Sequence, residues 1–260
     1  MNSKNYQDKK TFYDKMLTIY GRKPVLEALQ DRKLNIHRLH LASSNKAGGV
    51  INELLETAAQ RNIEVCYHDK AALSRISRNA KQDQGVAADI HYDNYITTTE
   101  FLEHYTAKPA QQPPKLLALC DIHNPQNLGM IIRSACAGNI DGILIPRKGC
   151  ASISPLVIKA STGTLFKATI IWCETLKDAL QELKEHGFSV CALSSHATES
   201  LFEYRPDGPI AYVLGNESEG VSPEILKLAD KKLMIPMQNG VESLNVAITA
   251  ALIAFNDCST

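Results

Sequence analysis

The chain has 260 residues, of which 44% are apolar and 22% are charged, and its formal net charge is zero. These values are ordinary for a folded globular protein, and the length suits two domains better than one or three. The N-terminus carries no apolar leader, and no apolar run approaches the roughly 20 residues that a membrane span needs. We therefore expect a soluble, cytoplasmic protein without a membrane anchor.

Positive charge is concentrated in the first third of the chain. Residues 1–81 hold 15 Lys and Arg against 8 Asp and Glu, a surplus that the rest of the chain cancels. This surplus suits contact with a polyanionic partner, and a solvated basic face explains it equally well.

The cysteines and histidines predict no metal site. The seven cysteines are scattered, and no two of them have Cys-x-x-Cys spacing. Most lie in apolar runs, as reduced core thiols do, so we expect neither disulfides nor bound zinc. His37, His40, His68 and His91 lie in or beside predicted strands. Their spacings match no standard zinc pattern, which favours strand-edge or surface positions.

The first 92 residues predict a polar tail followed by a small α/β domain. Residues 1–16 read as a flexible tail, and a helix is predicted from Tyr20 with Pro24 in its first turn. The later predicted elements are a strand at 36–41, a helix at 49–60, a strand at 63–67, a helix at 70–76 and a strand at 85–90. Alternation of this kind indicates a separate layered domain over residues 17–92.

Residues 93–114 predict a linker between two domains. The three threonines at 97–99 and the prolines at 109, 113 and 114 interrupt both helical and strand periodicity. Such a composition is typical of a semi-rigid tether.

From residue 115 onward the pattern becomes strongly βα. Strands are predicted at 116–120, 142–145, 169–172, 188–193, 210–214 and 232–235, and helices at 128–137, 155–161, 176–186, 223–229 and 244–255. Because near-continuous apolar strands are buried on both faces, they predict a mostly parallel sheet with helices on both sides. Dinucleotide, P-loop, metalloprotease and nucleophile-elbow motifs are all absent from this region.

Two predicted strands each run into a polar loop that contains glycine. The first strand ends in Tyr212-Val213-Leu214 and is followed by the loop Gly215-Asn216-Glu217. The second ends near Ile235-Pro236-Met237, and its loop leads to Ser243-Leu244-Asn245. Neighbouring loops of this kind build ligand sites at the carboxyl ends of parallel strands. Taken alone, the first loop is equally well an ordinary turn, and for Ser243 the N-cap of the last helix is the commoner role.

The predicted helix at 128–137 is apolar nearly all round, yet Arg133 lies in the middle of it. A guanidinium there either reaches out to water or points into a polar pocket, and the sequence favours neither. Asn127 and Gly129 precede it at the start of the helix.

Three ordered motifs resemble those of a known family. They are Asn127-x-Gly129-x-x-x-Arg133, Leu214-Gly215-x-Glu217-x-x-Gly220, and Ile235-Pro236-Met237 through Ser243-Leu244-Asn245-Val246. Over residues 115–260 the chain resembles the SpoU (TrmH-like) RNA ribose methyltransferases. The unit at 17–92 resembles, in layout, the ribosomal-protein-like substrate-binding domain of many members. Cys120, Asn124 and Asn239-Gly240 depart from the usual family pattern, which puts the local loop geometry in doubt.

The resemblance implies transfer of a methyl group from S-adenosylmethionine to a ribose 2′-hydroxyl in structured RNA. It also implies a trefoil-knotted SPOUT-type fold and a homodimer with the site near the subunit interface. Large-subunit ribosomal RNA is the first candidate substrate and transfer RNA the second. A non-catalytic RNA-binding or ribosome-assembly protein is the main alternative, and a nucleotide-dependent oxidoreductase is disfavoured by the missing glycine fingerprint.

The resemblance also assigns roles to eight residues. Gly215, Ile235 and Leu244 match cofactor-binding positions. Arg133, Glu217, Ser243 and Asn245 match catalytic or substrate-binding positions, with Asn127 supporting the loop. Because guanidinium groups hardly ever deprotonate, we expect Arg133 to bind the phosphate beside the target ribose and Glu217 to accept the proton or position Arg133.

Overall fold

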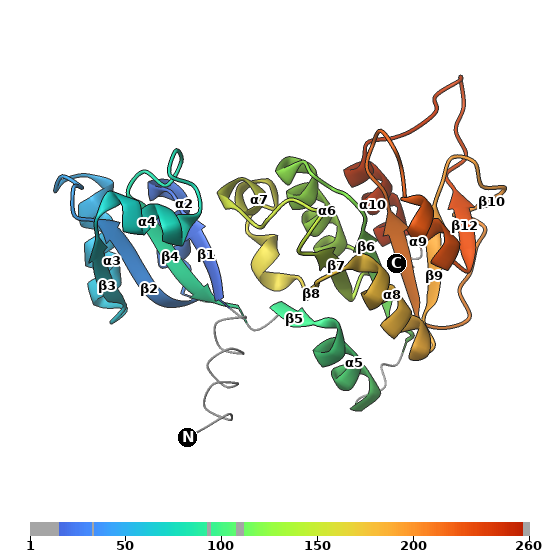
Figure 1. Cartoon of the computed structure of the whole chain (residues 1–260), viewed down its shortest axis with the longest axis horizontal. Coiled ribbons are helices and arrows are strands. Elements are labelled where there is room, and N and C mark those ends of the chain that lie inside the picture. The colour runs from blue at the N-terminus through green and yellow to red at the C-terminus, as the bar shows by residue number, and fades with distance from the viewer. Residues whose placement is uncertain (1–15, 33, 93–94, 108–111, 257–260) are drawn as a thin grey trace. The chain divides into compact units, whose positions relative to one another are not determined.

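A computed structural model of the chain describes residues 16–32, 34–92, 95–107 and 112–256 (Figure 1). These residues form two compact units, one built mainly from residues 16–92 and the other mainly from residues 95–256. Apart from Met16, the predicted polar tail lies outside the described residues. Within the described ranges no helix is both long enough and apolar enough to cross a membrane.

The first unit is a small sheet with helices. Its strands are β1 (Met16–Tyr20), β2 (Asn35–Ala42), β3 (Glu64–His68) and β4 (Val86–His91), in the spatial order β1-β4-β2-β3. Its helices are α2 (Arg22–Gln30), α3 (Val50–Gln60) and α4 (Lys70–Ser77). The sequence missed β1, although Leu17 and Ile19 are buried and alternate with more exposed neighbours. That period of two is the signal that would have identified the strand.

A β-bulge in β2 decides which side chains face which side of this sheet. The register between β2 and β4 shifts between Ile36 and Arg38, so His37 is the extra residue. Because of the bulge, Ile36 and Leu39 are both buried although they are three residues apart. Arg38 and His40 then lie on the opposite face of the strand.

The second unit is an eight-stranded sheet in which every described strand pair is parallel. Its strands are β5 (Tyr95–Thr97), β6 (Lys115–Leu119), β7 (Gly142–Pro146), β8 (Ile170–Cys173), β9 (Ser189–Leu193), β10 (Glu199–Ser200), β11 (Ile210–Leu214) and β12 (Lys231–Met234). The spatial order is β10-β12-β9-β11-β6-β7-β8-β5. The central strands β6 and β11 are neighbours, which brings their carboxyl ends together.

Helices cover both faces of the large sheet. They are α5 (Thr98–Ala107), α6 (Pro125–Ala137), α7 (Pro155–Ala160), the 3₁₀ helix η1 (Thr164–Lys167), α8 (Leu176–Glu185), α9 (Pro223–Leu228) and α10 (Val246–Phe255). Buried side chains of α5, α8 and α9 pack with Leu116 and Ala118 on one face. Side chains alternate along a strand, so Leu117 and Leu119 face the other side, where α6 and α10 pack together. The predicted α/β architecture is confirmed, whereas the trefoil knot stays a prediction.

The stretch predicted as a linker contains regular structure. Residues 95–107 form β5, which pairs with β8, and α5, whose Phe101 and Leu102 are buried in the core of the large sheet. Thr97 and Glu100 form a capping box: the backbone N–H of Glu100 donates to Thr97 Oγ1 (3.1 Å), and that of Thr97 to Glu100 Oε2 (2.8 Å). The threonine run was therefore a helix start rather than a helix breaker.

Candidate functional site

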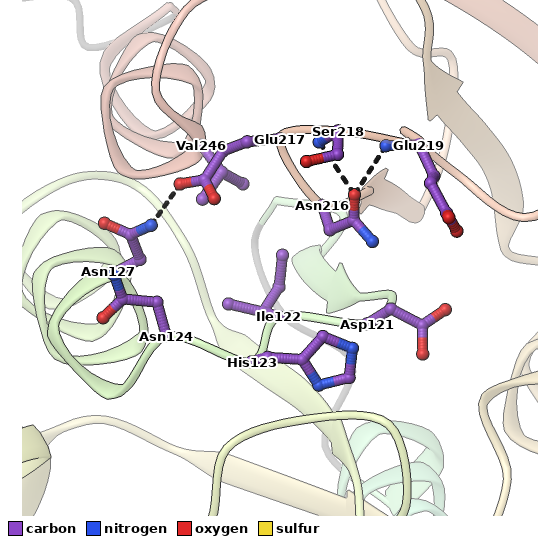
Figure 2. A pocket seen from close by; sticks show the side chains of 10 residues that line it. All are labelled: Asp121, Ile122, His123, Asn124, Asn127, Asn216, Glu217, Ser218, Glu219 and Val246. Atoms are coloured by element: carbon purple, nitrogen blue, oxygen red, sulfur yellow. Dashed lines mark hydrogen bonds between the residues drawn. The ribbon is translucent and has the colours of Figure 1, made fainter.

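A cavity of about 390 Å³ lies beyond the carboxyl ends of β6 and β11 (Figure 2). It is lined by Asp121, Ile122, His123, Asn124, Asn127, Asn216, Glu217, Ser218, Glu219 and Val246. These residues come from the β6–α6 segment, the β11–α9 loop and the start of α10. The position is the one that open parallel sheets use for ligands, and the volume falls in the usual range for small-molecule pockets.

The start of α6 is held in place by capping and by close packing. Asn124 is the N-cap, and its side chain accepts the backbone N–H of Gln126 at 2.9 Å. Asparagine therefore caps this helix where the family pattern has another residue. A Cβ on Gly129 would lie 2.5 Å from Ala160 Cβ and 2.6 Å from Val157 O, so this glycine allows α7 to approach α6.

The loop after β11 is closed by its own backbone. A Cβ on Gly215 would lie 1.9 Å from the carbonyl carbon of Gly220, so no larger residue fits there. The Asn216 side chain accepts the backbone N–H groups of Ser218 (2.9 Å) and Glu219 (2.7 Å). This tight turn fixes the backbone on both sides of Glu217.

Three of the predicted site residues meet in one hydrogen-bonded cluster. The side-chain amide of Asn127, which is 6% exposed, donates to Glu217 Oε1. Asn245 Nδ2 lies 3.3 Å from the same oxygen and 3.2 Å from Asn127 Oδ1. Each residue comes from a different sequence motif, and Figure 2 shows Glu217 reaching from its loop to Asn127. Among the described residues Glu217 Oε2 has no hydrogen-bond partner, so it remains available to a ligand.

Asn245 is also the N-cap of α10, because its side-chain oxygen accepts the backbone N–H of Ala247 at 2.9 Å. One amide thus serves two purposes: its oxygen caps the helix, and its nitrogen binds Glu217. The alternative that made Ser243 the cap of this helix is wrong.

Six predicted site residues do not line the cavity, although one of them, Asn245, reaches the lining residue Glu217. Arg133 is exposed on α6 and has no ion-pair partner among the described residues. Ile235, Ser243 and Leu244 lie on the segment 235–245, which leads from β12 to α10 (Figure 1). Gly215 directly precedes the lining residue Asn216. Of the two outcomes left open for Arg133, the structure shows exposure to water.

The departure from the family pattern at Asn239-Gly240 is accommodated by the backbone. Asn239 has φ 57° and Gly240 has φ 74°, and the N–H of Val241 donates to the carbonyl of Gln238 at 3.2 Å. Both residues are therefore in the left-handed region, which asparagine tolerates better than most residues.

Sequence reasoning gave no role to several residues that line the cavity, among them Asp121 and His123. A polar run directly after the apolar strand β6 was the available signal. Asp121 takes φ 57°, and a Cβ on Gly149 would lie 2.6 Å from its Oδ1. Glycine at 149 therefore makes room for this carboxylate.

The lining favours a ligand with positive charge or hydrogen-bond donors, because it presents three carboxylates and three side-chain amides. The thiols beside it are not nucleophiles at neutral pH. Burial raises the pKa of Cys120, and it raises the pKa of Cys150 to about 11, so both stay protonated. The arrangement thus suits proton acceptance by a carboxylate rather than covalent catalysis by a thiolate.

Comparisons with known proteins find similarity to RNA methyltransferases over both parts of the chain. Residues 114–255 match a family model described as the SpoU rRNA Methylase family, and residues 18–96 match one described as RNA 2'-O ribose methyltransferase substrate binding. A Staphylococcus haemolyticus protein named within the TrmH family of tRNA/rRNA methyltransferases is 31% identical over 79% of this chain and 81% of its own length. A Bacillus subtilis protein named likewise is 29% identical over 91% and 93%.

A solved structure shows a similar fold. The SpoU methyltransferase AviRb from Streptomyces viridochromogenes, in complex with AdoMet, gives a TM-score of 0.63 at 20% identity. The similarity covers 98% of this chain and 92% of the other.

Proposed function

Because the chain belongs to the SpoU rRNA methylase family, we propose that it transfers a methyl group from S-adenosylmethionine to a ribose 2′-hydroxyl of structured RNA. Large-subunit (23S) ribosomal RNA is the substrate we place first and transfer RNA the second. The observation that carries the proposal is the meeting of Asn127, Glu217 and Asn245 at the edge of an acid-lined cavity.

The chemistry of the site suits S-adenosylmethionine. When bound, this cofactor supplies a methyl group activated by a positively charged sulfonium. The carboxylates of Asp121, Glu217 and Glu219 line the cavity and favour a cation, while Ile122 and Val246 add apolar surface. We assign cofactor binding to Gly215, Ile235 and Leu244, whose loops adjoin this cavity on either side.

We assign to Glu217 the role of accepting the proton of the ribose 2′-hydroxyl. Two amides donate to its Oε1, which orients the carboxylate, so Oε2 is the atom that would accept the proton. Asn127 and Asn245 are therefore positioning residues. Such preorganisation contributes to rate because the carboxylate need not reorient during the reaction.

Arg133 is assigned to the phosphate next to the target ribose. Its guanidinium is exposed and has no described partner, and guanidinium groups bind phosphate oxygens bidentately. Ser243 is assigned to the ribose or the RNA backbone, because it is exposed on the segment between β12 and α10.

RNA capture is assigned to residues 17–92 and methyl transfer to residues 115–260. The match of residues 18–96 to a substrate-binding model supports the first assignment, as does the basic surplus of residues 1–81. Residues 95–107 are assigned to the second unit as well, which is supported by the pairing of β5 with β8 and by the burial of Phe101 and Leu102 in the core of the large sheet.

A homodimer is part of the proposal. Helix α10 is apolar on every side, yet Ile248 and Phe255 are each 49% exposed in the single chain. On the neighbouring helix α6, Met130 is 41% exposed, three residues before Arg133. Burial of these side chains by a second copy would place Arg133 at the subunit interface.

The test is transfer of labelled methyl from S-adenosylmethionine to total RNA from a strain that lacks the enzyme. Nuclease mapping then locates the modified nucleotide. We expect one labelled ribose position, and we expect Arg133→Ala and Glu217→Gln each to lower turnover on the order of 10²-fold. Lys227→Ala is the matched control, because it removes a cation from α9 on the opposite face of the sheet.

Two outcomes would overturn the proposal. Label on a base instead of a ribose would contradict the assigned acceptor. An absence of label despite binding of S-adenosylmethionine would favour the non-catalytic RNA-binding alternative. Label in a transfer RNA would retain the chemistry and replace the first substrate by the second.

A further inference from the structure

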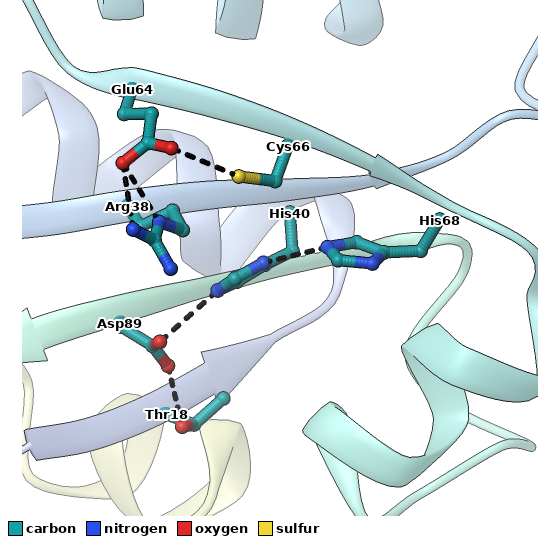
Figure 3. Close-up of polar contacts among 7 residues, drawn as sticks. All are labelled: Thr18, Arg38, His40, Glu64, Cys66, His68 and Asp89. Carbon is teal, nitrogen blue, oxygen red and sulfur yellow. Dashed lines mark hydrogen bonds and ion pairs between the residues drawn. The ribbon is translucent and has the colours of Figure 1, made fainter. Parts of the chain in front are cut away.

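The sheet of the first unit carries a polar cluster that plays no part in the proposed methyl transfer (Figure 3). It lies on the face to which the β2 bulge directs Arg38 and His40. Helix α4 covers one end of this face, where Leu73 packs on Ala42 and Ala87. The other end carries Thr18, Arg38, His40, Glu64, Cys66, His68 and Asp89.

Three potential metal ligands converge at the centre of this cluster. They are one ring nitrogen of His40, one of His68, and Cys66 Sγ, which all lie within 4.8 Å of one another. His40 Nδ1 is 2.9 Å from His68 Nε2. Two nitrogens bound to one tetrahedral zinc ion, with bonds of about 2.0–2.1 Å, lie about 3.3 Å apart. Small side-chain rotations would therefore bring these donors to a single ion.

The donors are carried by rigid elements. His40 lies on β2 directly opposite Cys66 on β3, and His68 follows Cys66 on the same face of that strand. His40 is 4% exposed, so the expectation of a strand-edge or surface position is wrong for this residue. The search for zinc spacing missed the cluster because strand pairing, not sequence proximity, brings its members together.

A carboxylate orients the buried histidine from behind. Asp89 Oδ2 lies 3.0 Å from His40 Nε2, and Thr18 donates to Asp89 Oδ1 at 2.6 Å. With Nε2–H donating to Asp89, the lone pair of His40 Nδ1 faces His68 and Cys66. Histidines that bind metals usually donate their other ring N–H to a carboxylate, a backbone carbonyl or water.

Glu64 is held away from the centre by an arginine. Arg38 Nε and Nη2 both donate to Glu64 Oε2, at 3.0 and 2.8 Å. The other oxygen accepts from the Cys66 thiol at 3.4 Å. Arg38 keeps Glu64 paired through Oε2 when the Cys66 thiol loses its proton, and the fourth position of an ion is assigned to water.

We propose that His40, Cys66 and His68 bind one divalent transition-metal ion, with zinc as the best match to two imidazoles and a thiolate. Zinc prefers tetrahedral sites built from nitrogen and sulfur, whereas magnesium and calcium prefer oxygen. Binding replaces the His40–His68 hydrogen bond by two nitrogen–metal bonds. The Cys66 thiol loses its proton to solvent, and the Nε2 proton of His68 moves to Nδ1, so one proton is released per ion.

The test uses the full-length protein, stripped with a chelator, kept under a non-metal-binding reductant and titrated with Co²⁺ and then Zn²⁺. We expect one equivalent of Co²⁺ to give the visible bands of a tetrahedral ion together with a thiolate-to-cobalt charge-transfer band, and Zn²⁺ to displace it. Cys66→Ser should abolish the charge-transfer band. Asp89→Asn should keep that band but weaken affinity by about 10- to 100-fold, because it replaces the carboxylate that accepts from His40 by a neutral amide.

Controls separate this site from non-specific binding. Cys136→Ser and His196→Gln remove a partly buried thiol and an exposed imidazole elsewhere, and both should leave the titration unchanged. Circular dichroism of each variant checks that it folds. Absence of stoichiometric binding, or a charge-transfer band that survives in Cys66→Ser, would overturn the proposal and leave the cluster as a hydrogen-bonded network. Methyl transfer is not measured, so the result is independent of the proposed function.

Discussion

At the scale of single residues, the site depends on side chains that serve more than one purpose. Asn245 caps α10 with its oxygen and binds Glu217 with its nitrogen. Asn124 caps α6 while lining the cavity, and Gly215 permits the loop that presents Glu217. A change at any of these positions therefore mixes an effect on folding with one on chemistry, and a useful variant must separate the two.

Asn245 allows that separation. Asn245→Ser keeps a good N-cap but loses the amide that reaches Glu217, whereas Asn245→Ala loses both. We expect only the alanine variant to lower the free energy of unfolding, by about 1 kcal/mol. Both should lower kcat by about 10- to 100-fold, since a hydrogen bond to a charged group contributes about 1.5–3 kcal/mol. Urea unfolding and methyl-transfer kinetics measure the two effects. Full activity of Asn245→Ser would reduce Asn245 to a helix cap.

At the scale of helices and strands, local signals predicted most of the fold. Apolar runs identified β6 and β11, and Pro24 marked the start of α2. The two failures were β1, whose alternation was overlooked, and β5 with α5, whose capping box was taken for a linker. Both signals were present in the sequence. The sequence did not show which elements these segments pack against, because β5 pairs with β8, which lies far along the chain.

The candidate site was predicted less completely than the fold. The ordered motifs pointed to Asn127, Glu217 and Asn245, and the structure joins them. Arg133 could not be placed, because the pattern of α6 shows an apolar helix without showing which side is covered. Its neighbours in space come from other elements, or from a second copy of the chain.

The capping box makes a prediction at this scale. Thr97→Ala removes the oxygen that accepts the Glu100 N–H, so the start of α5 loses a partner. We expect a loss of about 1 kcal/mol in the free energy of unfolding, seen as a fall of about 2–4 °C in Tm for a unit of this size. Thr97→Ser keeps the oxygen and should behave like the wild type. Equal melting of Thr97→Ala and wild type would show that packing of Phe101 and Leu102 alone holds α5.

At the scale of the whole molecule, charge and apolar surface are divided between different parts. The basic surplus lies within residues 1–81, whereas the exposed apolar side chains of α6 and α10 belong to the second unit. Asn127 meets Asn245 at the starts of these two helices, and Gly138 meets Ala254 at their ends. The two helices therefore run parallel. Met130 and Ile248 each lie three residues after these asparagines, so they are at the same height along the helix axes.

The exposed apolar side chains of α6 and α10, which are Met130, Ile248 and Phe255, predict the oligomeric state. We expect the wild type to sediment as a dimer and Ile248→Glu to shift it toward monomer, because a buried unpaired carboxylate is strongly unfavourable. Phe202→Glu changes an exposed aromatic side chain outside α6 and α10 and is the matched control. Analytical ultracentrifugation over a range of concentrations measures both. A monomeric wild type, or equal dissociation of the two variants, would contradict the homodimer.

The pairing of β5 with β8 decides where the chain can be divided without cutting an element. β4 ends at His91 and β5 begins at Tyr95, so a joint between the two units that cuts no described element has to lie between these two residues. A hybrid joined at residue 114, where the match to the methylase family begins, would lack β5 and leave β8 as an open edge that invites pairing with other chains. The unit that can be transferred intact is thus longer than residues 114–255, which the methylase model matches, because it must include its own edge strand β5.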